Sequence, residues 1–490
     1  MAPTVPPANP AATGDGMKTI LDWSAYEDAG MGDAYADIPR HGGDFAKAVA
    51  VCINSRRCED RTGKGVMCPS YRVTGDPALS TGGRVRLLKA ALNAELADAA
   101  LAEPGLARAM DLCVACKGCK RECENNVDMA LIKSEYLAQR ARRAGVGLRA
   151  RIFAGLPRWL HRHRPLARWL IAARNRHRWL ARLGERLLGI AADVPLPEPA
   201  RIPFRANGPT TTPSLAAADA SAPTLPEVVL LVDCFGRHFE PDIPDAALGV
   251  LRAAGYRVHI ATPAKRDPDP GRPLCCGRTY LAQGLVQQAA DEARRMLEAL
   301  LPHARAGRWI IGLEPSCLLS LRDDHLALGL GDAAREVAGR SLLLEELLAK
   351  ELMAKRLRLP FAADAASVAG TGALVHGHCH QKAVGAMKSM RKVLKLIPGM
   401  TPEVIDAGCC GMAGTFGLER EHAGPSRQMA ELSLLPQLRA APDAAVIANG
   451  FSCRQQIRAH CGQHPRHLAQ VLAEALAAPG GDDAGSPRAS

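Results

Sequence analysis

Four cysteines occupy eleven consecutive positions of this chain: Cys113, Cys116, Cys119 and Cys123. Three thiols at three-residue steps on one tight loop can point inward at one cubic iron–sulfur cluster. In ferredoxins with two clusters, the fourth cysteine of such a run binds the other cluster of the pair. The spacing therefore predicts a 4Fe–4S cluster held by Cys113, Cys116 and Cys119. Its fourth ligand must come from elsewhere, and Cys68 is the candidate.

Cys123 would then face a second site, together with Cys52 and Cys58. At the ferredoxin spacing the middle ligand of this second group would fall at position 55, where the chain has Ser55. Three thiols leave it open whether a second cluster binds. Zinc is the alternative to iron–sulfur, but zinc sites use two Cys-x2-Cys pairs separated by a longer insert. The continuous run at 113–123 favours iron–sulfur.

Two Cys-Cys-Gly sequences, at 275–277 and 409–411, form a second pattern. They are offset by 134 residues, and the cysteines that close each set, Cys317 and Cys453, are offset by 136. Offsets this similar indicate two copies of one unit. Strand-like apolar runs alternate with helical stretches in both copies, which predicts small parallel α/β sheets. The two cysteine sets are Cys234, Cys275, Cys276 and Cys317, and Cys379, Cys409, Cys410 and Cys453.

The cysteines of both sets follow predicted strands. Loops at the carboxyl ends of parallel strands meet at one edge of a sheet, so thiols far apart in sequence can converge there. Soft thiolates select iron–sulfur clusters, zinc or copper(I). We predict a metal at these sets and leave its identity open between an iron–sulfur cluster and zinc. His376, His378 and His380 alternate around Cys379 and could be ligands, proton carriers or packed core residues.

These patterns divide the chain into segments and predict a multi-domain α and α/β fold. An all-helical ferredoxin-type domain precedes two repeated small parallel α/β units. We expect an exposed arm at 1–44, the ferredoxin-type domain at 45–138, basic helices at 139–190, a Pro-rich linker at 191–226, the first Cys-Cys-Gly unit at 227–360, the second at 361–478 and a disordered tail at 479–490.

Residues 1–20 contain no apolar segment of the kind that directs secretion, and no stretch approaches 18 apolar residues. We therefore expect no secretion signal and no spanning helix, and a reducing cytoplasmic location. There, 16 cysteines indicate metal or redox chemistry rather than structural disulfides. Only 4% of the residues are aromatic and no RNA-binding aromatic motif is present, so no nucleic-acid partner is expected.

The net charge of +12 is concentrated between Arg140 and Arg186, which enclose 14 arginines and one acid. Such a stripe predicts an acidic protein partner or an anionic membrane surface. Trp159, Trp169 and Trp179 recur every ten residues within it. The favoured interpretation is that they anchor these helices on the protein's own core. The alternative is a helix that lies at a membrane interface, as a peripheral contact with the cytoplasmic face of the inner membrane.

Several stretches resemble known iron–sulfur proteins. The two Cys-Cys-Gly units are similar to the cysteine-rich domains of the heterodisulfide reductase subunit that carries such motifs. The order of domains resembles the iron–sulfur subunits of glycolate oxidase and anaerobic glycerol-3-phosphate dehydrogenase. It also resembles the carboxyl-terminal half of bacterial FAD-linked D-lactate and D-2-hydroxyglutarate dehydrogenases. The stretches that carry this resemblance are Met67–Tyr71, Cys116–Cys119, Val127–Ala130, Cys275–Thr279, Glu314–Cys317, His376–Lys382, Cys409–Gly414 and Gly450–Arg454.

The resemblance implies an iron–sulfur electron-transfer subunit of an FAD-linked oxidoreductase that oxidises a 2-hydroxyacid such as lactate, glycolate or 2-hydroxyglutarate. Electrons would pass from a separate flavoprotein toward quinone or a soluble carrier. No flavin site is expected on this chain, so FAD belongs to the partner and catalysis requires it.

The chain departs from these families at a few positions. Heterodisulfide reductase closes each set with a further cysteine where this chain has Ser320 and Gln456, so each set here has four thiols. That departure leaves an ordinary four-ligand cluster or zinc open at the two sets. Two other functions stay open as well: a disulfide-reductase-like enzyme acting at these sites, and a non-redox zinc-binding interaction protein.

Overall fold

The computed structural model describes residues 17–205, 226–365 and 372–477, apart from positions 32, 34–35, 62–64 and 363. The expected tail at 479–490, most of the expected linker and the first sixteen residues of the expected arm lie outside the described residues.

The amino-terminal part is helical, and no strand occurs among the residues described before position 190. Its helices surround a buried apolar core that includes Phe45, Leu88 and Tyr136. The helices are α1 (Asp44–Ala50), α2 (Pro69–Thr74), α3 (Thr81–Asn93), α4 (Ala97–Ala100), α5 (Pro104–Asp111), α6 (Cys119–Glu122) and α7 (Met129–Ala144), with short 3-10 turns at Ser24–Tyr26, Arg57–Glu59 and Pro77–Leu79.

The expectation of an exposed arm is wrong for part of the segment 17–44. Leu21 and Trp23 are only 4% and 3% exposed and lie in the core of the helical domain. The carboxylate of Glu135 on α7 holds this segment, accepting hydrogen bonds from the Leu21 backbone N–H at 2.8 Å and from Trp23 Nε1 at 3.1 Å. A long-range contact of this kind leaves no local pattern in the sequence.

Removal of the Glu135 carboxylate should therefore loosen the amino-terminal segment. We expect Glu135→Ala to lower the free energy of unfolding by about 3 kcal/mol, because several buried N–H groups lose their acceptor. Chemical denaturation measures this change. Glu124→Ala, at an exposed glutamate of the same domain, is the control and should leave the unfolding curve unchanged. Equal stability of the two variants would contradict the anchoring role of Glu135.

Two small parallel sheets build the carboxyl-terminal part. The first has the order β2-β1-β3-β4 and the second the order β6-β5-β7, with every pair parallel. In the first unit β1 lies between β2 and β3, and in the second unit β5 lies between β6 and β7. This repeated arrangement confirms the predicted fold class. The strands are β1 (Glu227–Leu231), β2 (Arg257–Ile260), β3 (Trp309–Gly312), β4 (Ser341–Leu343), β5 (Gly372–His376), β6 (Thr401–Val404) and β7 (Ala445–Ala448).

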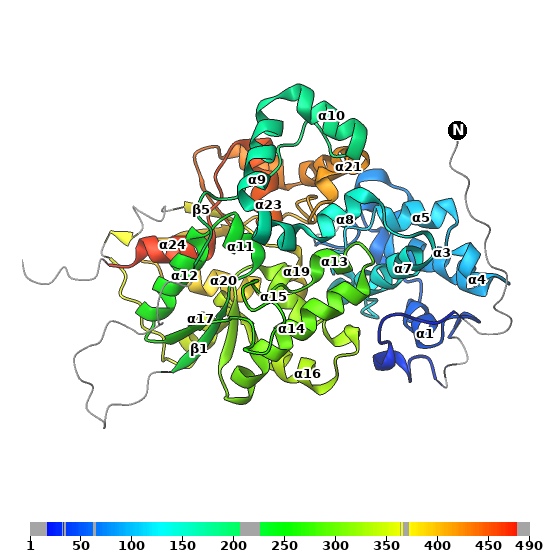
Figure 1. Ribbon diagram of the computed structural model, residues 1–490, viewed down its shortest axis with the longest axis horizontal. Helices are drawn as coiled ribbons and strands as arrows, with labels where there is room; N and C mark the ends of the chain where they lie inside the picture. The colour runs from blue at the N-terminus through cyan, green and yellow to red at the C-terminus, as the bar shows by residue number, and fades with distance from the viewer. Residues whose placement is uncertain are drawn as a thin grey trace, which may run out of the picture.

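The two sheets share one hydrophobic core, in which Val228 and Ile311 of the first pack in the same cluster as Val375 and Ile447 of the second. Figure 1 shows the two units side by side, with the helical domain at one end. Their helices are α11 (Cys234–His238), α12 (Asp242–Ala253), α13 (Arg278–Leu281), α14 (Val286–Arg305), α15 (Pro315–Arg322), α16 (Gly331–Gly339), α17 (Leu344–Met353), α19 (Cys379–Val384), α20 (Met387–Leu394), α21 (Arg420–Glu431), α22 (Leu434–Ala440), α23 (Phe451–Cys461) and α24 (Leu468–Ala475), with 3-10 turns at Leu326–Leu328 and Phe416–Leu418.

The basic segment forms α8 (Leu148–Ala154), α9 (Leu156–Arg176) and α10 (Arg178–Leu188). Helix α9 loses helical geometry at His163, shortly before Pro165, as expected for a proline inside a helix. Helices α9 and α10 project at the top of Figure 1, away from the sheets. No helix among the described residues combines the length and the apolar character needed to cross a membrane.

The interpretation that the three tryptophans anchor the basic helices on the core is not supported. Trp159, Trp169 and Trp179 are 38%, 64% and 65% exposed. The helices are instead tied down through their arginines. Arg168 Nη1 donates to Pro199 O at 2.7 Å and Arg174 Nη1 to Val194 O at 2.7 Å. The irregular residues 191–205 thus run along α9 and accept hydrogen bonds from it.

Candidate metal centres

Four thiols line one internal pocket in the helical domain. Its lining includes Cys68, Cys113, Cys116 and Cys119. Cys68 precedes α2 and Cys119 opens α6, whereas the other two lie on the loop between α5 and α6. The fold therefore brings the predicted fourth thiol, Cys68, to the three thiols of the run. Their role as ligands of one cluster remains a prediction.

The loop that carries Cys116 adopts an unusual backbone. Ala115 and Lys117, on either side of Cys116, have φ angles of +46° and +59°. Residues with a Cβ rarely occupy this region, and each such residue costs about 1–2 kcal/mol. Such strain is expected where a loop must turn its side chains inward, and the binding of a metal would offset it.

Two buried basic side chains line this pocket. The guanidinium of Arg84 and the ammonium of Lys117 are both buried and both belong to its lining. Arg84 is held by hydrogen bonds to Ala109 O at 2.7 Å and to Ser70 Oγ at 2.8 Å. Because Lys117 is paired with Asp323 and Asp324, Arg84 is the buried cation that would stabilise the negative charge of a thiolate-ligated cluster. The pocket is therefore suited to an anionic cluster.

Backbone N–H groups at the start of α3 point at two sulfurs. Thr81 N donates to Cys68 Sγ at 3.1 Å, and Gly82 N donates to Cys58 Sγ at 3.2 Å. These donors lie at the positive end of a 13-residue helix. Hydrogen bonds to ligand sulfurs help to set the reduction potential of an iron–sulfur cluster. The start of α3 thus contacts both predicted sites of the helical domain.

Cys52, Cys58 and Cys123 form the neighbouring group. Burial raises the pKa of the Cys52 thiol, and nearby Cys58 and Cys123 raise it further. The hydrogen bond with Cys68 lowers the pKa of Cys58 to about 6. Cys58 therefore lies between this group and the first pocket. All three thiols are partly buried, and whether they hold a cluster with Ser55 in place of a fourth thiol stays a prediction.

The first Cys-Cys-Gly set gathers four buried thiols at the strand ends. Cys234 and Cys276 each lie close enough to Cys275 and Cys317 for the thiols to shift one another's pKa. Gly277 completes the turn, with a φ of +76°. A Cβ at this position would lie 2.7 Å from the Ala289 carbonyl oxygen, so the turn needs glycine.

The second set repeats this arrangement. Cys409 lies close enough to Cys379 and Cys410 for the thiols to shift one another's pKa, and Cys410 likewise lies close to Cys453 and His376. Gly411 has a φ of +85°, and a Cβ there would lie 2.0 Å from a backbone oxygen of α21. In both units the fold thus brings the four predicted cysteines together, and their ligand role stays a prediction.

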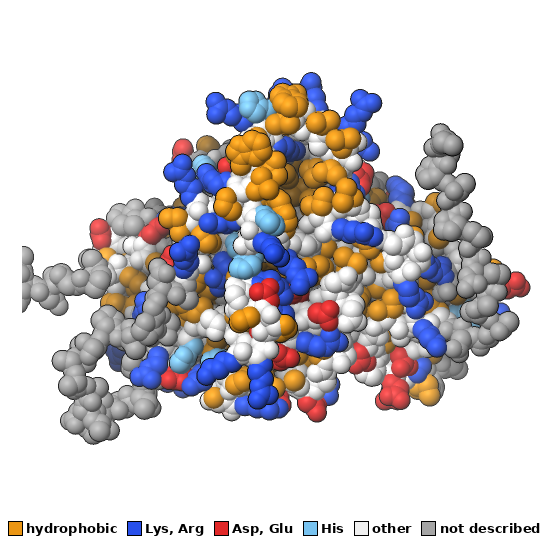
Figure 2. Space-filling view, viewed as in Figure 1, with side chains coloured by type: hydrophobic (Ala, Val, Ile, Leu, Met, Phe, Trp, Pro, Cys, Tyr) orange, Lys and Arg blue, Asp and Glu red, His pale blue; other side chains and the backbone are white. Residues whose placement is uncertain are grey.

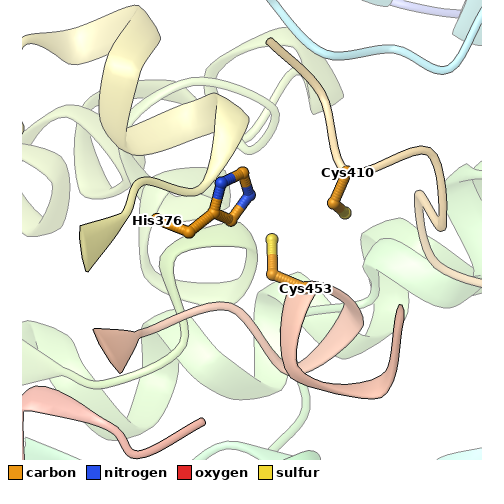
Figure 3. A group of neighbouring side chains, drawn as sticks. All are labelled: His376, Cys410 and Cys453. Carbon is orange, nitrogen blue, oxygen red and sulfur yellow. The ribbon is translucent and has the colours of Figure 1, made fainter. Parts of the chain in front are cut away.

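The three histidines around Cys379 have different surroundings. His378 caps α19, its Nδ1 accepting from His380 N at 3.1 Å. His380 Nε2 lies 3.2 Å from the Ala115 carbonyl oxygen, on the loop that carries Cys116. A ring nitrogen of His376 and the sulfurs of Cys410 and Cys453 all lie within 4.8 Å of one another. Figure 3 shows these three side chains pointing toward a common point.

The second set lies directly against the four-thiol pocket. Cys379 and Cys409 form a small buried cluster with Val66, and Val114 and Cys116 pack against it. Burial raises the pKa of the Cys116 thiol, and nearby Cys379 raises it further. No pattern in the sequence indicates this contact, because it joins residues from two predicted domains.

A buried charge cluster joins the helical domain to the first Cys-Cys-Gly unit. Lys117 Nζ lies 2.7 Å from carboxylate oxygens of both Asp323 and Asp324. Arg278, next to Gly277, lies 2.7 Å from the second oxygen of Asp324. Sequence reasoning missed these residues, because single charged residues at separate positions carry no pattern.

Comparison with known families matches residues 48–127 to the family described as "4Fe-4S dicluster domain". This segment contains the seven cysteines from Cys52 to Cys123. The match supports 4Fe–4S clusters in this part of the chain and confirms the predicted cofactor.

Several known proteins are similar to this chain. D-2-hydroxyglutarate dehydrogenase of Escherichia coli (strain K12) is 24% identical over 469 residues, covering 87% of this chain and 43% of that protein. A subunit of the anaerobic glycerol-3-phosphate dehydrogenase of the same strain is 25% identical over 260 residues, covering 51% of this chain and 59% of that protein. Lactate utilization protein A of Bacillus subtilis (strain 168) is 22% identical over 258 residues, covering 50% of this chain and 98% of that protein.

This chain spans less than half the length of the D-2-hydroxyglutarate dehydrogenases that it matches. The comparisons confirm the resemblance to iron–sulfur proteins of hydroxyacid dehydrogenases. The family match and the dehydrogenase names of the relatives support an iron–sulfur oxidoreductase role for this chain.

Proposed function

We propose that this chain carries electrons away from a flavoprotein that oxidises a 2-hydroxyacid, and delivers them to quinone or a soluble carrier. The flavoprotein holds FAD and performs the hydride chemistry. This chain holds its metal centres through the cysteines of its four groups. The proposed ligands are Cys68, Cys113, Cys116 and Cys119; Cys52, Cys58 and Cys123; Cys234, Cys275, Cys276 and Cys317; and Cys379, Cys409, Cys410 and Cys453.

The observation that carries this proposal is the contact between the four-thiol pocket and the second Cys-Cys-Gly set. Cys58 adjoins Cys68 of the pocket, and Cys379 and Cys409 adjoin Cys116 of the pocket. Iron–sulfur clusters, when bound, supply one-electron carriage at potentials that the protein adjusts. Three cysteine groups in which each adjoins the next are the arrangement expected of a relay, whereas a zinc-binding interaction protein would not require it.

Purification of the complex tests the proposed flavoprotein partner directly. We expect the affinity-tagged chain, purified anaerobically from its native cells, to carry iron and an FAD-containing protein, with about one FAD per chain. The FAD released on denaturation measures this ratio. An untagged culture taken through the same column is the control. A chain that purifies with its iron but without flavin would contradict the proposal.

We further propose that α9 and α10 rest on an anionic membrane surface, at the cytoplasmic face of the inner membrane. Among the described residues, these helices expose a group of large apolar side chains beside exposed arginines. Figure 2 shows apolar side chains and basic side chains gathered on this projection. The apolar group is Trp159, Leu166, Trp169, Leu170, Trp179, Leu183 and Leu187.

Charge and apolar surface together favour a membrane as the occupant. Exposed tryptophans on a basic amphipathic helix are typical of segments that lie in the lipid headgroup region. Each basic residue near an anionic surface contributes about 1 kcal/mol of attraction, which salt screens. The exposed arginines include Arg158, Arg162, Arg178 and Arg182, whereas Arg168 is occupied by a backbone carbonyl.

Vesicle binding tests this surface. We expect the chain to sediment with phosphatidylglycerol vesicles at low salt, and much less at high salt or with phosphatidylcholine. The double variant Trp169→Glu, Trp179→Glu should bind at least about tenfold more weakly, because it loses buried apolar area and adds negative charge. The control, Leu96→Glu with Met353→Glu, adds the same charge at exposed sites elsewhere. Equal binding by the wild type and the tryptophan variant would contradict the membrane contact.

A further inference from the structure

His376 is a buried histidine without an ordinary structural role. It ends β5, and its side chain is only 1% exposed. The Cys410 sulfur interacts with the ring, and neither ring nitrogen has a hydrogen-bond partner of good geometry among the described residues. Buried polar groups are nearly always hydrogen-bonded, and an exception calls for an explanation such as an absent ion. The two other histidines of this segment have structural roles: His378 caps α19, and His380 contacts the Ala115 carbonyl oxygen.

The groups that face the ring are thiols. A ring nitrogen of His376 and the sulfurs of Cys410 and Cys453 lie within 4.8 Å of one another (Figure 3). They come from the end of β5, from the Cys-Cys-Gly turn and from the start of α23. Ligands of one tetrahedral metal ion lie about 3.5–4 Å apart, given metal–nitrogen and metal–sulfur bonds of about 2.0–2.3 Å. The three atoms are therefore near enough to bind the same metal atom.

The first unit has no equivalent of this group. His376 is the last residue of β5 and lies three residues before Cys379. The equivalent position in the first unit is Leu231, which is the last residue of β1 and lies three residues before Cys234. Among the described residues, no three thiols of the first set lie within 4.8 Å of one another. The repeat thus replaces an apolar strand end with an imidazole in the second unit only.

We propose that His376 is a nitrogen ligand of the metal centre in the second Cys-Cys-Gly unit, where it binds the same metal atom as Cys410 and Cys453. The two units therefore hold chemically different centres: sulfur donors alone in the first, and nitrogen with sulfur in the second. Imidazole and thiolate together suit zinc or iron. An imidazole is neutral, so His376 adds a nitrogen donor to the four thiolates of the second set without changing their total charge.

Variants at position 376 separate a ligand from a packed core residue. His376→Leu installs the residue of the first unit and removes the nitrogen. We expect the variant to bind the metal of this site at least about tenfold more weakly than the wild type. Chelator competition, followed by metal analysis of the protein fraction, measures this affinity. His376→Cys restores a donor atom and should retain the metal. His467→Leu is the control for general destabilisation, because His467 is also fully buried and its ring contacts Leu313 O. This variant should keep the metal of the second Cys-Cys-Gly set.

Spectroscopy of the wild type detects the ligand directly. If the site holds zinc, X-ray absorption should show a nitrogen neighbour at about 2.0–2.1 Å beside sulfur, and this neighbour should vanish in His376→Cys. If the site holds iron, pulsed EPR should show coupling to an imidazole nitrogen that the same variant removes. Sulfur-only coordination in the wild type, or full metal retention by His376→Leu, would overturn the proposal. The signals of the helical domain serve as a reference, since they do not depend on His376.

Discussion

Cys116→Ser should abolish one low-potential 4Fe–4S EPR signal and stop electron transfer through the chain. Cys116 lines the four-thiol pocket and is also the thiol of that pocket that packs against the second Cys-Cys-Gly set. Its loss removes a proposed ligand at the point where two centres meet. We expect the variant to lose about four iron atoms, and residues 60–130 to become sensitive to proteolysis, because a bound metal stabilises the strained loop around Cys116.

Cys461→Ser is the matched control for this variant. Cys461 is partly buried at the end of α23 and belongs to none of the four cysteine groups. The control should keep the wild-type iron content and EPR spectrum. An unchanged EPR spectrum and iron content in Cys116→Ser would show that the assignment of this ligand is wrong.

Asp324→Asn should be the most destabilising substitution outside the cysteine groups. Its carboxylate lies 2.7 Å from both Lys117 Nζ and Arg278 Nη1, with all three side chains largely buried. Loss of one partner from a buried ion pair costs about 3–5 kcal/mol. Lys117 keeps its contact with Asp323, whereas Arg278 loses its contact with the Asp324 carboxylate. The contact of Lys117 with Asp324 joins the helical domain to the first Cys-Cys-Gly unit, so the variant should also weaken their association. Chemical denaturation measures the first effect and limited proteolysis the second.

The pH dependence of stability gives an independent measurement of this cluster. Burial would raise the pKa of Asp324, but the charges of Lys117 and Arg278 outweigh it and hold this pKa well below its ordinary value. A lowered carboxyl pKa stabilises the fold above the unfolded pKa of about 4, and that contribution is lost as the pH falls further. Wild-type stability should therefore fall below about pH 4 more steeply than that of Asp324→Asn. Glu336→Gln, in an exposed pair with Arg305, should behave like the wild type. Parallel pH profiles for all three proteins would show that this cluster does not stabilise the fold through its charges.

The convergence of the cysteine sets was predictable because it depends on simple spacing rules. The run Cys113–Cys119 fixes three thiols on one loop, and the matched Cys-Cys-Gly offsets indicate a repeated parallel unit whose strand ends meet. Gly277 and Gly411 occupy left-handed turns in close contact with a backbone oxygen, so each turn requires the glycine of its Cys-Cys-Gly sequence.

The contacts between domains were not predictable. His380 reaches Ala115, and Lys117 reaches Asp324, across more than two hundred residues. Each depends on one side chain that meets its partner only after the domains pack, so no periodicity indicates it. The burial of Trp23 beside Glu135 was missed for the same reason. The exposure of Trp169 was missed because a tryptophan on an amphipathic helix has the same sequence pattern on a core face and on a binding face.

Electrons from a hydroxyacid should reach the iron–sulfur centres of this chain through a flavoprotein. Anaerobic rapid mixing of the purified complex with D-lactate, glycolate or D-2-hydroxyglutarate tests this transfer most directly, with the visible absorbance of the clusters as the readout. We expect one of these acids to bleach the cluster absorbance after the flavin is reduced. The Cys116→Ser complex should reduce its flavin without reducing the centres beyond the broken step. Flavin reduction by the hydroxyacid with no bleaching of the wild-type clusters would contradict the proposed electron transfer.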